Sequence, residues 1–124
     1  MHTPVDVTEK ALEYAKLSKV DSIISIGGGS TTGLGKAIRI RTRLPRICIP
    51  TTYAGSEMKS ILSETADRRK TTRSNPRILP ATVIYGVDLT MTLPVEMSST
   101  SGVNAIAHAS MCICDHTASS EGEN

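Results

Sequence analysis

The segment Ser22-Ile-Ile-Ser-Ile-Gly-Gly-Gly-Ser-Thr-Thr-Gly-Leu-Gly-Lys-Ala-Ile38 decides the fold of this 124-residue chain. Its isoleucine-rich start, residues 22–26, is typical of a buried β-strand. Three glycines, Gly27 to Gly29, end that strand, and Ser30 and Thr31 then offer hydroxyl groups that can cap a helix. The apolar residues that follow fit one face of that helix, namely Leu34, Ala37 and Ile38.

A strand, a glycine turn and a helix N-terminus together favour the binding of an anion. Glycines let backbone N–H groups approach a phosphate, and the helix dipole adds partial positive charge. The spacing does not match the Walker A loop, because Ser30 stands where that loop needs its first glycine and Ala37 follows Lys36. It does not match the Rossmann fingerprint either, because Thr32 replaces the third glycine. A tight turn without a ligand is the alternative interpretation.

Composition excludes several classes of function. A net charge of +2, with neither Trp nor Phe, gives no basic and aromatic surface for nucleic acid. No apolar run approaches the roughly 20 residues of a membrane span, and the N-terminus lacks the apolar core of a signal peptide. The three cysteines have no spacing that indicates a disulfide framework. We therefore expect a cytoplasmic protein that binds neither membrane nor nucleic acid.

A second strand and a hydroxyl-rich loop lie downstream of the glycine turn. A helix is predicted over residues 6–19, with Asp6 and Glu9 at the spacing of a capping box. Ile47-Cys-Ile49 predicts another buried strand, followed by Pro50-Thr-Thr-Tyr-Ala-Gly-Ser-Glu57. In a parallel sheet this loop and the glycine turn meet at the carboxyl edge, where such folds bind ligands. A plain hydroxyl-rich loop remains the alternative.

The rest of the chain predicts further elements of an α/β domain. The arginine-rich stretch 39–46 is interpreted as a solvated helix end and loop. A β-hairpin is predicted over 61–73 and a strand over 77–85. Ser98 to Ser101 offer N-cap candidates for a last helix over 102–111. On that last helix Asn104, His108 and Cys112 fall on one face. A lone histidine there is more often structural than a ligand, and the spacing of Cys112 and Cys114 does not predict a zinc site.

Five blocks, taken in order, resemble the maleylacetate reductase branch of the iron-containing alcohol dehydrogenase superfamily. They are Ile26-Gly-Gly-Gly-Ser-Thr-Thr-Gly-Leu-Gly-Lys-Ala-Ile38, Pro50-Thr-Thr-Tyr-Ala-Gly-Ser-Glu57, Lys70-Thr-Thr72, Leu79-Pro80 with Val83-Ile-Tyr85, and Ser101-Gly-Val-Asn-Ala-Ile-Ala-His-Ala109. The resemblance implies a reductase of unsaturated keto-dicarboxylates from aromatic degradation that uses NAD(H) or NADP(H). It also implies a small-molecule substrate and a parent enzyme that is a homodimer.

The resemblance also implies roles for individual residues. The pyrophosphate would be held by Gly27, Gly28, Gly29 and Ser30. The nicotinamide side would be lined by Thr51, Thr52 and Ser56, with Lys70 near the cofactor or its ribose. His108 and Asn104 would be the catalytic residues beside the substrate. In metal-dependent relatives an aspartate stands at the position of Asn104 and binds iron or zinc. A neutral amide is a weaker ligand, so we do not expect a metal here.

The same resemblance implies a fold class, namely an incomplete Rossmann-like parallel sheet related to dehydroquinate synthase, with the first helix of an all-α second domain. We expect a partial dinucleotide-binding domain over 1–94, the start of a helical substrate domain over 95–111, and a divergent, disordered tail over 112–124. A chain of this extent is expected to be a fragment without activity of its own. Three alternatives stay open: a fragment of an iron- or zinc-type alcohol dehydrogenase, a non-catalytic nucleotide-binding module, and a nonfunctional gene product.

Overall fold

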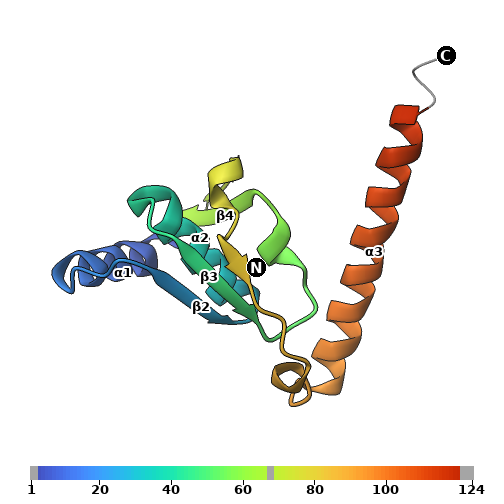
Figure 1. Ribbon diagram of the computed structural model, residues 1–124, viewed down its shortest axis with the longest axis horizontal. Helices are drawn as coiled ribbons and strands as arrows, with labels where there is room; N and C mark the ends of the chain where they lie inside the picture. Colours follow the sequence, from blue (N-terminus) through green and yellow to red (C-terminus); the bar gives the residue numbers. More distant parts are fainter. Residues whose placement is uncertain (1–2, 67–68, 121–124) are drawn as a thin grey trace.

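The computed structural model describes residues 3–66 and 69–120, without the side chains of His108 and residues 111–120. It confirms the predicted α/β class (Figure 1). The helices are α1 (Val5–Leu17), α2 (Gly29–Thr42) and α3 (Val95–Ser120), and short 3-10 turns form η1 (Ser56–Met58), η2 (Pro76–Ile78) and η3 (Val87–Thr90). The strands are β1 (Thr3–Pro4), β2 (Ile23–Gly27), β3 (Arg46–Pro50), β4 (Ile61–Ala66), β5 (Arg69–Ser74) and β6 (Thr82–Val83).

The strands form two three-stranded sheets. In the first, β2, β3 and β6 are all parallel, which is the parallel sheet that the sequence predicts. In the second, β1 runs parallel to β4, and β4 and β5 form the predicted antiparallel hairpin. The register of the first sheet pairs Gly27 with Pro50, so β2 and β3 end at the same edge.

Helix α2 packs against strands of both sheets. Towards the hairpin and η2 an apolar cluster of Ala37, Leu62 and Ile78 is buried, and polar contacts to the backbone and to Glu64 surround it. Towards the parallel sheet the contacts are largely polar, since Thr32 Oγ1 lies 3.7 Å from Cys48 Sγ. A side chain at Gly35 would collide there with the Ser25 hydroxyl, so this residue lets helix and sheet approach closely.

Arg46 corrects the interpretation of the arginine-rich stretch as solvated. Its side chain is fully buried beneath α2, where the guanidinium donates to the backbone oxygens of Thr32 and Ile78, both at 3.5 Å. The prediction was wrong for Arg46 because β3 begins at this residue and the parallel pairing directs its side chain towards α2.

The opposite face of the parallel sheet carries apolar side chains that water reaches. Ile24 and Ile26 are 60% and 57% exposed, whereas Ser25 between them is buried towards α2. This alternation follows from the two-residue period of a strand. Parallel sheets in α/β proteins are normally covered on both faces, so the exposed isoleucines are unusual.

Several predicted boundaries shift in the structure. The strand expected over 77–85 is reduced to η2 and the two residues of β6, because Pro80 lacks the N–H group that a central strand needs. Helix α1 begins after Pro4, and Asp6 lies in its first turn without acting as the cap. Helix α2 likewise begins at Gly29 with Gly28 as its cap, so Ser30 and Thr31 lie inside the helix.

Helix α3 stands apart from the rest of the molecule and is longer than predicted at both ends (Figure 1). It starts at Val95, directly after Pro94, and Thr100 donates back to the Glu96 oxygen at 2.8 Å, so the serine and threonine residues there do not cap a later helix. Residues 112–120, expected as a disordered tail, continue the helix, and residues 121–124 lie outside the described part. The proposed domain division stays a prediction. Within the described residues, no helix combines the length and apolar character needed to span a bilayer.

Candidate functional site

The turn between β2 and α2 requires glycine. Gly27 has a φ of +145°, a conformation that other residues rarely adopt, and a Cβ atom there would lie 2.7 Å from Thr31 Oγ1. A Cβ atom on Gly28 would lie 3.1 Å from Thr52 Cγ2. No side chain caps α2, so the N–H groups of its first turn are open to an external acceptor.

The loop after β3 lies beside this turn, as the sequence predicts. The Thr51 N–H donates to the Gly27 oxygen at 3.1 Å, and Thr52 is the side chain nearest to Gly28. Ser56 opens η1 at the end of the same loop. The parallel register therefore brings the ends of β2 and β3 together. Ser56 and Gly29 also line one cavity, so six of the residues assigned to the cofactor lie close together.

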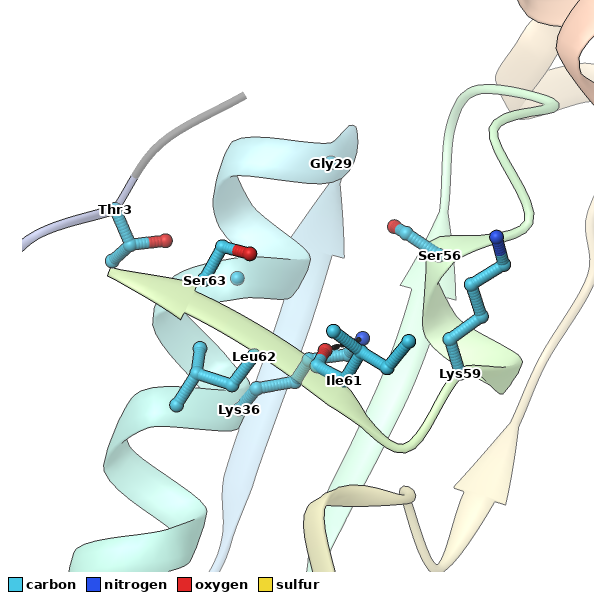
Figure 2. Close-up of a pocket in the computed structure, with 9 residues that line it drawn as sticks. Thr3, Gly29, Lys36, Ser56, Lys59, Ile61, Leu62 and Ser63 are labelled. Carbon is cyan, nitrogen blue, oxygen red and sulfur yellow. Dashed lines mark hydrogen bonds between the residues drawn. The ribbon is translucent and has the colours of Figure 1, made fainter. Parts of the chain in front are cut away.

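That cavity of about 230 Å³ lies between the start of α2, the first residues of β4, and η1 (Figure 2). Its wall carries two lysines and three hydroxyl groups, and the lining residues are Thr3, Gly29, Gly33, Lys36, Ser56, Lys59, Ile61, Leu62 and Ser63. Basic and hydroxyl groups around a helix N-terminus suit an anionic ligand. We name this space the first cavity.

Lys36 is the buried cation of the first cavity. Its Nζ donates to the Ile61 oxygen at 2.8 Å, as the dashed line in Figure 2 shows. The pKa of Lys36 is lowered to about 8, mainly by burial and also by the neighbouring Arg46, while Glu57 acts in the opposite direction. Nothing in the sequence distinguishes Lys36 from the exposed lysines of a helix except its place seven residues after Gly29, on the same helix face.

A second cavity of about 290 Å³ lies on the other side of the loop, lined by Pro50, Thr52, Tyr53, Gly55, Glu57, Tyr85, Gly86, Val87, Thr90 and Met91. Tyr85 donates from its hydroxyl to Glu57 Oε1 at 2.9 Å. Burial and the Glu57 carboxylate raise the pKa of Tyr85 to about 12. This bond ties the end of the loop to the segment after β6. Sequence reasoning placed Glu57 in the loop motif but gave neither it nor Tyr85 a role.

Two predicted site residues lie on α3. The Asn104 Nδ2 donates to the Ala54 oxygen at 3.4 Å, so its side chain faces the loop. Hydrogen bonds from Thr90 and Ser98 lower the pKa of Tyr53, and Ser98 is a second polar contact between the loop and α3. His108 follows Asn104 by one helical turn, and its side chain lies outside the described residues.

The structure does not bring Lys70 to the glycine turn. Lys70 lies in β5 opposite Thr65, and it lines neither the first nor the second cavity. Its assignment to the cofactor stays a prediction. The described side chains contain no cluster of three histidine, cysteine or acidic residues that could hold a metal ion, and the expectation about the metal also stays a prediction.

Sequence and structure comparisons relate the chain to known proteins of one family. The family model described as iron-containing alcohol dehydrogenase matches residues 1–86. The maleylacetate reductase of Rhizobium sp. (strain MTP-10005) is 58% identical over 109 residues, which cover 88% of this chain and 31% of the relative. The crystal structure of maleylacetate reductase from Agrobacterium tumefaciens superposes with a TM-score of 0.85 at 57% identity, covering 88% of this chain and 31% of that chain.

A more distant structure has the same fold. The NADH-dependent butanol dehydrogenase A of Thermotoga maritima is 27% identical, with a TM-score of 0.73, over 82% of this chain and 31% of that chain. Across these comparisons the chain spans less than a third of the length of the proteins that it matches.

Proposed function

Because the chain belongs to the iron-containing alcohol dehydrogenase family, we propose that it forms the nicotinamide-dinucleotide-binding part of a maleylacetate-type reductase. Such an enzyme reduces unsaturated keto-dicarboxylates. The bound reduced nicotinamide supplies the hydride. The high identity to maleylacetate reductases supports this substrate class over the alcohols of other family members.

The observation that carries the proposal is the meeting of the glycine turn and the hydroxyl-rich loop at one sheet edge. Gly27 and Gly28 leave room that a Cβ atom would fill, and the first turn of α2 offers its N–H groups to a pyrophosphate. Thr51 and Thr52 stand directly beside them, where their hydroxyls can donate to ribose or carboxamide oxygens. The described residues therefore fit a dinucleotide.

A metal-independent reaction is part of the proposal. Asn104 offers a neutral amide whose nitrogen already donates to the Ala54 oxygen, and a neutral oxygen binds iron or zinc more weakly than a carboxylate does. This feature speaks against the alternative of a metal-dependent alcohol dehydrogenase. His108, one turn further along α3, remains the proposed group beside the substrate.

The remaining parts of the proposal concern the oligomeric state, the substrate and the cellular location of the enzyme. We propose a homodimeric parent enzyme with a small-molecule substrate. We also propose a cytoplasmic location.

Cofactor binding is tested by titrating the purified 124-residue chain with NADH and following nicotinamide fluorescence. Saturable binding that ADP-ribose displaces is expected, because both molecules share the pyrophosphate. Absence of binding to a folded chain would refute the proposal. A parallel titration with NADPH determines which of the two cofactors is preferred.

The substrate class is tested in a chimera. The matched 109 residues of the Rhizobium reductase are replaced by those of this chain, which keeps 58% of the residues in that segment. We expect maleylacetate-dependent oxidation of NADH that persists after treatment with a chelator. A folded chimera without turnover would contradict the substrate class, and turnover that requires added zinc or iron would contradict the metal-independent reaction.

A further inference from the structure

Lys36 holds the segment that forms one wall of the first cavity. It lies in the third turn of α2, is only 4% exposed, and donates to the Ile61 oxygen at 2.8 Å (Figure 2). Ile61 is the first residue of β4, and η1 with Ser56 comes shortly before it. The bond therefore fixes the point at which the chain leaves the loop and enters the hairpin.

The surroundings of Lys36 carry an excess of positive charge. Arg46 and Cys48 face it from β3, and Glu57 and Lys59 face it from η1 and the residue after it. Arg46 and Lys36 are both buried, and Glu57 is the buried carboxylate that partly compensates them. Burial of an ammonium group costs stability, as the lowered pKa of Lys36 shows. An apolar side chain of similar length would avoid that cost.

The ammonium faces the same space as the start of α2. Gly29, Gly33 and Lys36 are spaced by four and three residues, so they share one face of the helix, and all three line the first cavity. The Cα atoms of Gly29 and Lys36 are about 10 Å apart along the helix axis. At this separation a charge in a partly buried wall still acts on a phosphate at the helix N-terminus.

We propose that Lys36 is a positioning residue of the cofactor site, which ties β4 to α2 and supplies fixed positive charge to the cavity beside the glycine turn. The inference rests on the proposed function, because it presumes that the cavity receives an anionic cofactor. It assigns to Lys36 two effects that a residue serving only the fold would not combine. Its removal weakens anion binding while the folded state keeps its stability, and the binding depends on the protonation of Lys36.

The test compares Lys36→Met with Lys36→Arg and with Lys16→Met, an exposed lysine of α1 that serves as the matched control. NADH affinity is measured by fluorescence at about pH 7 and about pH 9.5, on either side of the Lys36 pKa of about 8. We expect Lys36→Met to lose about tenfold in affinity at the lower pH, with a melting temperature close to that of the wild type. Lys16→Met should match the wild type in both.

The pH dependence of the NADH affinity distinguishes the effect of the Lys36 charge from the effect of the size and shape of its side chain. The wild-type affinity should fall between the two pH values as Lys36 loses its proton, whereas Lys36→Met should show little change. Lys36→Arg keeps its charge at both values, so it should bind NADH at the lower pH and retain that affinity at the higher one. If Lys36→Met binds NADH as tightly as the wild type, or if Lys36→Arg loses affinity like the wild type, the proposal is wrong.

Hydrogen exchange supplies a readout that needs no cofactor. Lys36→Met should exchange faster at the amides from Ser56 to Leu62, with β2 and β3 unchanged. Unchanged exchange in that segment overturns the proposal, whatever the wild type binds. A wild type that fails to bind NADH instead refutes the proposed function. If Lys36→Met does not fold, the wild type and Lys36→Arg still decide the question through their pH profiles.

Discussion

Replacing Gly28 with valine is expected to weaken NADH binding strongly while it leaves the fold in place. Gly28 caps α2 with φ −81° and ψ −163°, an extended conformation that any residue adopts, so the backbone itself tolerates the change. The new Cβ atom would lie 3.1 Å from Thr52 Cγ2, and the two valine methyl groups would occupy space beside the first turn of α2. The approach of a pyrophosphate to those N–H groups is thereby blocked.

The magnitude follows from the hydrogen bonds that are lost. A hydrogen bond to a charged group contributes about 1.5–3 kcal/mol, so the loss of one such bond lowers affinity by about tenfold to a hundredfold. The fold should lose about 1 kcal/mol, because valine is a poorer N-cap than glycine. That corresponds to a decrease of roughly 5 °C in melting temperature.

The assay is a fluorescence titration with NADH beside a thermal melt of the same sample. Gly102→Val is the matched control, because a Cβ atom on Gly102 in α3 meets nothing within 4 Å. The control should bind NADH and melt like the wild type. A folded Gly28→Val variant with wild-type affinity would refute the assignment of the phosphate to the glycine turn.

Three further predictions concern packing, titration and metal binding. Gly35→Ala should lower the free energy of unfolding by about 1–3 kcal/mol in a urea titration, because its methyl group meets the Ser25 hydroxyl beside buried Arg46; an unchanged midpoint would contradict this. Because the pKa of Tyr85 is raised to about 12, its contribution to the free energy of unfolding should be complete below about pH 10, the pKa of an unfolded tyrosine, and should decline as the pH rises towards 12. Thermal melts at several pH values should show this decline in the wild type and not in Tyr85→Phe. Asn104→Asp should bind Zn²⁺ more tightly than the wild type in calorimetry, since a carboxylate is the better ligand, and equal affinity would count against a role of this position in metal binding.

The sequence predicts the arrangement of the glycine turn and the loop after β3 better than it predicts the buried charges around them. The glycine turn and the loop after β3 could be placed together because parallel strands end at one edge, and the Thr51–Gly27 hydrogen bond confirms that arrangement. The environment of Lys36 and Arg46 could not be predicted. Helix α2 buries Thr32 towards the parallel sheet and Lys36 towards the start of β4, at positions where apolar residues are the usual choice.

The predicted element boundaries are wrong where one residue outweighs the local sequence pattern. Pro80 removes a donor from the strand expected over 77–85, and only two residues of β6 pair with β3. In α3 the hydroxyl residues from Ser98 to Ser101 suggested a helix start, but Pro94 already precedes the first turn. Pairing of β1 with β4 was not predicted, because two residues give no periodic signal.

The exposed isoleucines of the parallel sheet have a consequence for the life of the protein in a cell. Ile24 and Ile26 are two residues apart in β2, so they lie on the same face of the strand and form an exposed apolar patch. Exposed apolar surface of this kind favours association with other proteins, chaperones included. We therefore expect the steady-state abundance of the polypeptide to depend on how quickly this patch is covered after synthesis. Charged residues at these two positions are expected to prolong the half-life of the uncovered chain and to weaken any association made through this face of the sheet.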